Sequence, residues 1–190
     1  MQNLLSEIKK CTICEPHLDF GANPVVTGNK NSKIVIVGQA PGTKVHKSGI
    51  PWDDASGKQL RKWLNVSDEY FYDVENFAIV PMGFCYPGKG KSGDKPPRKE
   101  CAPQWHQKLF DKMPNLQMII LIGMYAQNYY LKDTAKRTLT ETVDNYPAYL
   151  PQYFVMPHPS PRNRFWLTKN PWFEKNVVPE LQKRVATIIN

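Results

Sequence analysis

Four short apolar runs divide the chain, and three of them are followed by a loop sequence. They are Ile34–Val37, Phe77–Val80, Met118–Ile122 and Tyr153–Met156. Continuous apolar runs of this length are typical of strands that are buried on both faces of a parallel sheet. Helical patterns alternate with the runs, which favours helices packed over both faces. The sequence therefore predicts an α/β fold built on a parallel sheet of these strands.

Two of the helical patterns, Ser56–Asn65 and Trp172–Ile189, are amphipathic, with apolar side chains on one side of the segment. Ser56 precedes the apolar face of one of them and is expected to cap that helix. No internal repeat or low-complexity tract is present, and 190 residues suit a single domain over residues 1–190. Helices are predicted around Leu4, Leu5 and Ile8, and over Ser56–Asn65, Cys101–Met113, Gly123–Leu131 and Trp172–Ile189.

Three of the predicted strands lead into loops with fixed shape. The loops are GQAPG (Gly38–Gly42), PMGFC (Pro81–Cys85) and PHPSPRN (Pro157–Asn163). Parallel sheets bind ligands in the crevice beyond the carboxyl ends of their strands. We therefore expect these loops to converge on one crevice that forms the functional site.

Basic residues outnumber acidic ones. There are 25 Lys and Arg against 17 Asp and Glu, which gives a formal net charge of +8. A basic globular chain often binds a polyanion, most often nucleic acid. No apolar run approaches the roughly 18 residues of a membrane span, and Met1–Lys10 has no signal-peptide core. We expect a cytoplasmic protein without a membrane partner, and a monomer, since no apolar helix face is left over after the core is built.

The cysteines form two pairs, Cys11 and Cys14 as C-x2-C, and Cys85 and Cys101 as C-x15-C. Cytoplasmic cysteines seldom form disulfides, so ligation of a metal or a cluster is one interpretation. Four unrelated buried thiols are the alternative, because free cysteine is among the most buried residue types. A zinc ribbon would favour two C-x2-C knuckles, and this chain has one. Spacing alone leaves the choice between zinc and an iron–sulfur cluster open.

Four sequence elements, in this order and at these spacings, resemble one known family. VGQAPG at Val37–Gly42 is followed, after six residues, by GIPW at Gly49–Trp52. Together with the cysteine arrangement, they resemble the iron–sulfur branch of the uracil-DNA glycosylase superfamily. HPSPRN at His158–Asn163 is similar to the second motif of the single-strand-selective monofunctional uracil glycosylases.

This resemblance implies a three-layer α/β/α fold with a central four-stranded parallel sheet. It also implies a monofunctional DNA glycosylase, which hydrolyses the N-glycosidic bond of a deaminated or modified base, uracil or a related one, in base excision repair. DNA would be the partner. A structural [4Fe–4S] cluster would be held by Cys11, Cys14, Cys85 and Cys101, with zinc as the alternative.

Two other functions stay open at this point. One is a non-catalytic protein that binds damaged or single-stranded DNA with the same pocket and cluster. The other is a zinc-stapled fold with an unrelated small-molecule substrate.

The resemblance also assigns roles to residues. His158 would donate a hydrogen bond to the base as negative charge develops, and Trp52 would stack on the extruded base. The ordinary alternatives are a histidine that caps a turn and a tryptophan in the core. Further substrate contacts would come from the first loop and from the second motif, through Gly38, Ala40, Pro41, Gly42 and Ser160.

Cationic side chains are the candidates for contacts with the DNA backbone. Arg162 and the neutral Asn163, which would also contact the DNA, end the second motif, and Lys91 and Arg98 lie in the loop between the last two cysteines. Such cations would contact phosphates and make binding sensitive to salt. Solvated surface charges are the alternative interpretation.

Two positions depart from the pattern of the branch. Gln39 stands where the branch has a carboxylate, and an amide can orient water but cannot take its proton. Asp53 or Asp54 could supply the missing charge, or could cap a helix. Pro81 stands where the family has an asparagine that pairs with the uracil edge, and proline has no N–H and no side-chain donor. A site without that pair should discriminate uracil poorly, so the base that is removed stays open.

Overall fold

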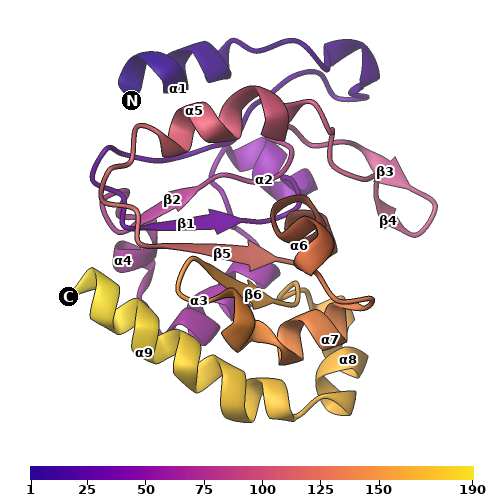
Figure 1. Ribbon diagram of the computed structural model, residues 1–190. Coiled ribbons are helices and arrows are strands. Elements are labelled where there is room, and N and C mark those ends of the chain that lie inside the picture. The colour runs from indigo at the N-terminus through magenta and orange to yellow at the C-terminus, as the bar shows by residue number, and fades with distance from the viewer.

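The computed structural model describes residues 1–190 and contains one parallel sheet between two layers of helices (Figure 1). The strand order is β2–β1–β5–β6, and every pair is parallel. This confirms the predicted α/β fold with a central four-stranded parallel sheet. The strands are β1 (Ile34–Val37), β2 (Phe77–Ile79), β5 (Met118–Ile122) and β6 (Tyr153–Met156).

The long helices lie where the amphipathic patterns predict them, but four short ones were not predicted. These are α2, α4, α7 and α8, each of six residues or fewer, too short to show a helical period. No helix is long and apolar enough to cross a membrane. The α-helices are α1 (Gln2–Lys9), α2 (Thr43–Ser48), α3 (Ala55–Leu64), α4 (Asp68–Tyr72), α5 (Gln107–Phe110), α6 (Met124–Leu131), α7 (Leu139–Asp144), α8 (Arg164–Lys169) and α9 (Val178–Ile189).

Shorter helical turns extend or connect these helices. Two π-helical turns lead into α5 and α9, so the helices predicted over 101–113 and 172–189 each change their winding near the start. The turns are the π-helical η2 (Ala102–His106) and η6 (Phe173–Val177), and the 3-10 helical η1 (Glu15–His17), η3 (Lys132–Thr134), η4 (Tyr146–Tyr149) and η5 (Pro161–Asn163).

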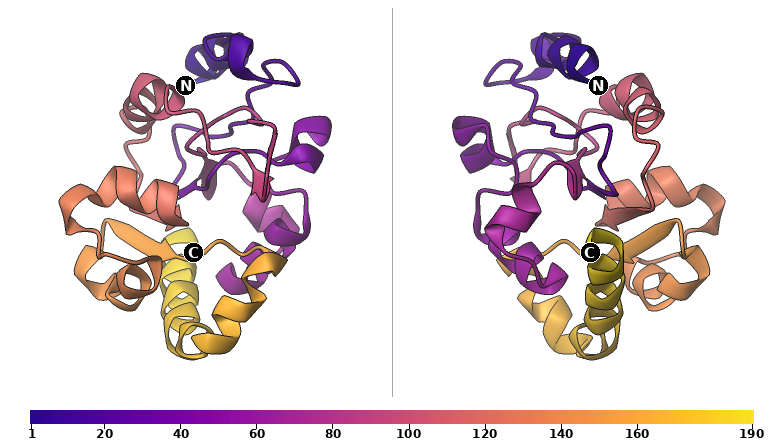
Figure 2. Two further views of the ribbon diagram at one scale, coloured as in Figure 1. Left: turned by 90° about the vertical axis from the view of Figure 1, so that its right-hand side faces the viewer. Right: turned by 90° about the vertical axis from the view of Figure 1, so that its left-hand side faces the viewer.

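Alternate residues of each strand face opposite sides of the sheet and join two separate cores. In β1, Val35 and Val37 face the core under α1 and α5, whereas Ile34 and Ile36 face the core under α3 and α9. All four are fully buried. Figure 2 shows these two helical layers on either side of the sheet. Burial on both faces explains why the strands read as continuous apolar runs.

The start of α3 differs from the prediction. The helix begins at Ala55, and the Asp54 carboxylate accepts a hydrogen bond from the Gly57 N–H at 2.8 Å. Asp54 therefore caps the helix, and the expected cap at Ser56 is wrong. Ser56 lies one position inside the helix and is buried there.

A small hairpin was also not predicted. Strands β3 (Lys89–Gly90) and β4 (Gly93–Asp94) pair antiparallel and project beyond the carboxyl end of the sheet (Figure 1). Strands of two residues are too short to show an alternating pattern, so no sequence signal marks them.

Candidate functional site

A cleft of about 490 Å³ opens at the carboxyl ends of the strands, where the loops after β1, β2 and β6 meet. The predicted convergence of these loops is therefore present. The cleft is lined by most of the residues that the sequence singles out, namely Gly38, Gln39, Ala40, Pro41, Gly42, Trp52, Pro81, His158, Ser160, Arg162 and Asn163.

Backbone hydrogen bonds between the first two loops fix one wall of the cleft. The Met82 N–H donates to the Gly38 carbonyl at 2.8 Å, and the Gly83 N–H donates to the Gln39 carbonyl at 3.0 Å. The Gln39 side-chain amide donates to the Lys95 carbonyl at 3.4 Å. Gln39 is thus held by backbone groups, and its side chain can offer hydrogen bonds to a ligand but no charge.

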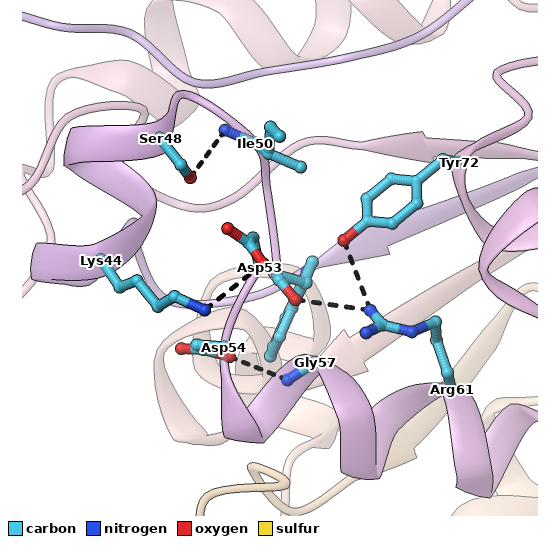
Figure 3. Close-up of polar contacts among 9 residues, drawn as sticks. Lys44, Ser48, Ile50, Asp53, Asp54, Gly57, Arg61 and Tyr72 are labelled. Carbon is cyan, nitrogen blue, oxygen red and sulfur yellow. Dashed lines mark hydrogen bonds and ion pairs between the residues drawn. The ribbon is translucent and has the colours of Figure 1, made fainter.

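Trp52 is held in an unusual backbone conformation beside the first loop. Its φ is 57°, in the left-handed region. The buried Arg61 guanidinium donates to the Trp52 carbonyl at 3.4 Å (Figure 3) and forms an ion pair with Asp68 at 2.6 Å. Gly57 lies so close that a Cβ there would be 1.7 Å from the Trp52 carbonyl oxygen. Contacts from Gly57 and Arg61 of helix α3 therefore fix the backbone of Trp52.

The indole ring of Trp52 lies over Gly38 and beside His158. A Cβ at Gly38 would come within 2.9 Å of the ring, so only glycine fits under it. The Trp52 and His158 rings are 5.5 Å apart between centroids, at an interplanar angle of 33°. The two aromatic groups that the sequence predicted from distant motifs are thus neighbours in one cleft.

His158 follows the end of β6 and is partly buried in the cleft. Burial lowers its pKa below the ordinary value, and the nearby Asp54 charge opposes this effect in part. The imidazole is therefore neutral at neutral pH and carries one N–H that can be donated. The Asn163 side-chain amide donates to the His158 carbonyl at 2.7 Å and fixes this loop.

Of the two consecutive aspartates, only Asp54 lines the cleft. Asp53 instead forms an exposed ion pair with Lys44 at 3.4 Å (Figure 3). Asp53, for which a substrate contact was expected, therefore lies outside the cleft lining, because the turn after Trp52 directs consecutive side chains to different sides. Such exposed pairs contribute little to stability.

The β3–β4 hairpin forms part of the cleft wall. Ser92, Gly93 and Asp94 line the cleft there, and a Cβ at Gly93 would lie 2.8 Å from the Arg162 guanidinium. Arg162 and Lys91 are exposed, so both are accessible to a polyanion near the mouth.

Arg98 lies away from this cleft. Its guanidinium forms an ion pair with Glu100, with one contact of 3.1 Å, and it lies beside Cys14. The DNA contact of Arg98 stays a prediction, for a side chain whose charge is paired with Glu100 outside the cleft.

All four cysteines line one small cavity between the N-terminal segment and the η2 turn. Three are buried and Cys11 is partly exposed. Burial raises the pKa of Cys85 to about 11 and that of Cys101 to about 12, so these thiols are neutral unless a cation binds them. The two cysteine pairs, at least 71 positions apart in the sequence, are thereby brought together, as the ligation hypothesis requires.

The four thiols line one cavity without forming a ready-made site for a single metal ion. No group of three His, Cys, Asp or Glu side chains is arranged to hold one metal ion. A single zinc ion needs four ligands within about 2.3 Å of one point.

One residue of the site was missed by sequence reasoning. His106, in η2, is 2% exposed, and its Nε2–H donates to the Pro81 carbonyl at 3.1 Å. Its Nδ1 contacts the Tyr130 hydroxyl. His106 therefore supports the Pro81 loop from behind. No local pattern marks this contact, because it joins segments 25 residues apart.

Comparisons with known proteins agree with this geometry. Three curated relatives are named Type-4 uracil-DNA glycosylase. The protein from Thermotoga maritima is 29% identical over 84% of this chain and 81% of its own length. That from Saccharolobus solfataricus is 25% identical over 68% and 58%, and that from Archaeoglobus fulgidus is 26% identical over 68% and 62%.

A solved structure shares the fold. The solution NMR structure of a Methanosarcina acetivorans protein, assigned provisionally as a uracil DNA glycosylase, matches with a TM-score of 0.50 and 15% identity over 83% of this chain and 95% of that one. The family model described as Uracil DNA glycosylase superfamily matches residues 25–182. This match spans every strand of the sheet and every loop of the cleft, and so the chain belongs to the uracil-DNA glycosylase superfamily.

Proposed function

We propose that this protein is a monofunctional DNA glycosylase that removes uracil or a related deaminated base from DNA. The observation that carries the proposal is the placement of the His158 imidazole beside the Trp52 ring in the cleft at the carboxyl edge of the sheet. Family membership and the names of the curated relatives support the same activity.

The cleft suits a base taken out of the DNA stack. Extrusion costs a few kcal/mol, and stacking on an aromatic face returns about 1–3 kcal/mol per base. Trp52 offers such a face, since its ring lines the cleft. The His158 N–H would donate to the base oxygen on which negative charge develops as the glycosidic bond breaks. A preorganised donor of this kind contributes about 3–4 kcal/mol to the transition state.

Gln39 and Pro81 bear on which base is accepted. Gln39 would orient water or the base through its amide. Pro81 has no side-chain donor, and its carbonyl already accepts from His106. Few side chains in the cleft can therefore form hydrogen bonds that distinguish uracil from other deaminated bases. We propose that the protein accepts more kinds of deaminated base than an enzyme with asparagine at this position would.

We also propose that Cys11, Cys14, Cys85 and Cys101 hold a [4Fe–4S] cluster. The four thiols around one cavity, and their resemblance to the iron–sulfur branch, support it. The cluster would supply no chemistry to base release. It would tie the N-terminal segment to the loop that carries the β3–β4 hairpin.

The test is a screen of base release from oligonucleotides that carry uracil, hypoxanthine, xanthine or a modified pyrimidine, as single strands and duplexes. We expect an abasic product that is cleaved only after alkali treatment, since a monofunctional enzyme does not nick the strand. His158→Ala should lower the rate by two to three orders of magnitude, on the scale of a lost transition-state donor, about 10²–10³. Salt-sensitive binding without release of any base would refute the proposal and favour the non-catalytic DNA-binding protein.

A further inference from the structure

The cleft needs a group that can take a proton from water, and Gln39 cannot. Hydrolysis adds a water oxygen to the sugar carbon, and that water must lose a proton. The carboxylates that line the cleft are Asp54 and Asp94. Asp94 lies on the exposed hairpin and accepts a hydrogen bond from the Tyr86 hydroxyl at 3.3 Å.

Asp54 lies on the wall that carries the aromatic pair. It follows Trp52 by two positions, and its negative charge raises the pKa of His158 in the folded protein. No other ionisable group has a resolved effect on the pKa of His158. The carboxylate therefore lies close to the place where the leaving base and the sugar would be held.

The two oxygens of Asp54 have different surroundings. One accepts the Gly57 N–H at 2.8 Å and fixes the side chain at the start of α3. The other makes no hydrogen bond within the protein, and Figure 3 shows it free of any drawn contact. A carboxylate that is anchored through one oxygen and open through the other is oriented and still able to bind water.

We propose that Asp54 is the catalytic carboxylate that activates the hydrolytic water, in the role that Gln39 cannot fill. This inference rests on the proposed glycosylase function. The water oxygen bonds to the sugar C1′ as the C1′–N bond breaks, and the bonding pair leaves with the base. The proton that the water loses passes to the free oxygen of Asp54, and solvent later returns a proton to the base.

The simpler interpretation is that Asp54 only caps α3. Asn and Asp are equally good N-caps, so Asp54→Asn keeps the cap and removes the charge. We expect this variant to release base about 100-fold more slowly or worse in single-turnover assays, on the usual scale of general-base assistance. Its melting temperature should be unchanged, which separates catalysis from folding.

The neighbouring aspartate provides a matched control. Asp53→Asn makes the same chemical change at a residue that is outside the cleft lining and paired with Lys44 on the surface. It should keep the wild-type rate. A double variant, Asp54→Asn with Gln39→Asp, should regain part of the lost rate because it returns a carboxylate to the cleft.

The outcomes separate this inference from the proposed function. If the wild type releases a base and Asp54→Asn stays within about threefold of its rate, the assignment of Asp54 is wrong and the glycosylase function stands. An equal loss in Asp53→Asn, or a double variant no faster than Asp54→Asn, would also overturn the assignment. If the wild type releases no base from any substrate, the proposed glycosylase function is wrong, and so is the catalytic role of Asp54.

Discussion

Acidification should destabilise this protein through one buried histidine behind the cleft. His106 is stacked on Phe84 and Tyr130, with interplanar angles of 14° and 16°. Its Nε2–H donates to the Pro81 carbonyl, so its Nδ1 must accept from the Tyr130 hydroxyl. A proton on Nδ1 would turn this nitrogen into a donor, so it could no longer accept the hydrogen bond from the Tyr130 hydroxyl. Burial accordingly lowers the pKa of His106 from 6.5 to about 4.

The size and sign of the effect follow from proton linkage. Above pH 6.5, neither the folded nor the unfolded chain protonates this histidine, and it has no pH effect. Between pH 6.5 and about pH 4, the unfolded chain takes up a proton that the folded chain excludes, so stability falls as the pH falls. The pKa of His106 differs by about 2.5 between the unfolded and the folded chain. At about 1.36 kcal/mol for each pKa unit, this difference corresponds to about 3 kcal/mol of unfolding free energy.

Urea unfolding of the wild type and of His106→Gln, at several values from about pH 7.5 to about pH 4.5, measures this contribution. Both proteins share every other titrating group, so their difference in unfolding free energy isolates His106. The wild type should lose about 2–3 kcal/mol more than the variant over this range. A difference that stays constant with pH would refute the reasoning, since it would mean that His106 is protonated equally in both states.

Three further predictions concern the cleft, the cysteine cavity and the mouth. Gly57→Ala should cost about 2 kcal/mol or more in unfolding free energy and lower base release, because its Cβ would displace the Trp52 carbonyl, whereas Lys58→Ala in the same helix should be neutral in both assays. Cys101→Ser should abolish visible absorption at roughly 400 nm in anaerobically purified protein and lower the melting temperature, and an unchanged spectrum would contradict a cluster ligand at this position. Arg162→Ala should reduce the slope of log Kd against log salt for DNA by about one, and an unchanged slope would show that this exposed cation does not contact a phosphate.

The strands and the order of the loops could be predicted from the sequence alone. Val35 and Ile36 point to opposite faces, and both must be apolar because helices cover both sides of the sheet. In a chain where such runs alternate with helical segments, a run of this kind indicates a buried strand of a parallel sheet. Since parallel strands end at one edge, the meeting of the GQAPG and HPSPRN loops followed as well.

The placement of individual charges depended on tertiary structure. Asp53 and Asp54 are adjacent and chemically identical, and only the turn into α3 decides that one faces the cleft and the other the solvent. The sequence shows Arg98 only as one cation in a basic loop, and its pairing with Glu100 is visible only in the structure. Nothing in the sequence distinguishes His106 from the other three histidines, and only the structure shows that it is buried and donates to the Pro81 carbonyl.

The division has one physical cause. Burial of an apolar run is a property of many consecutive side chains, and a sequence displays it as a pattern. The direction and the partner of a single polar side chain depend on contacts between distant segments, and no local pattern records them. The sequence by itself thus determined the sheet, its loops and the motif residues of the cleft, while only the folded chain decided which carboxylate, which cation and which histidine belong to the site.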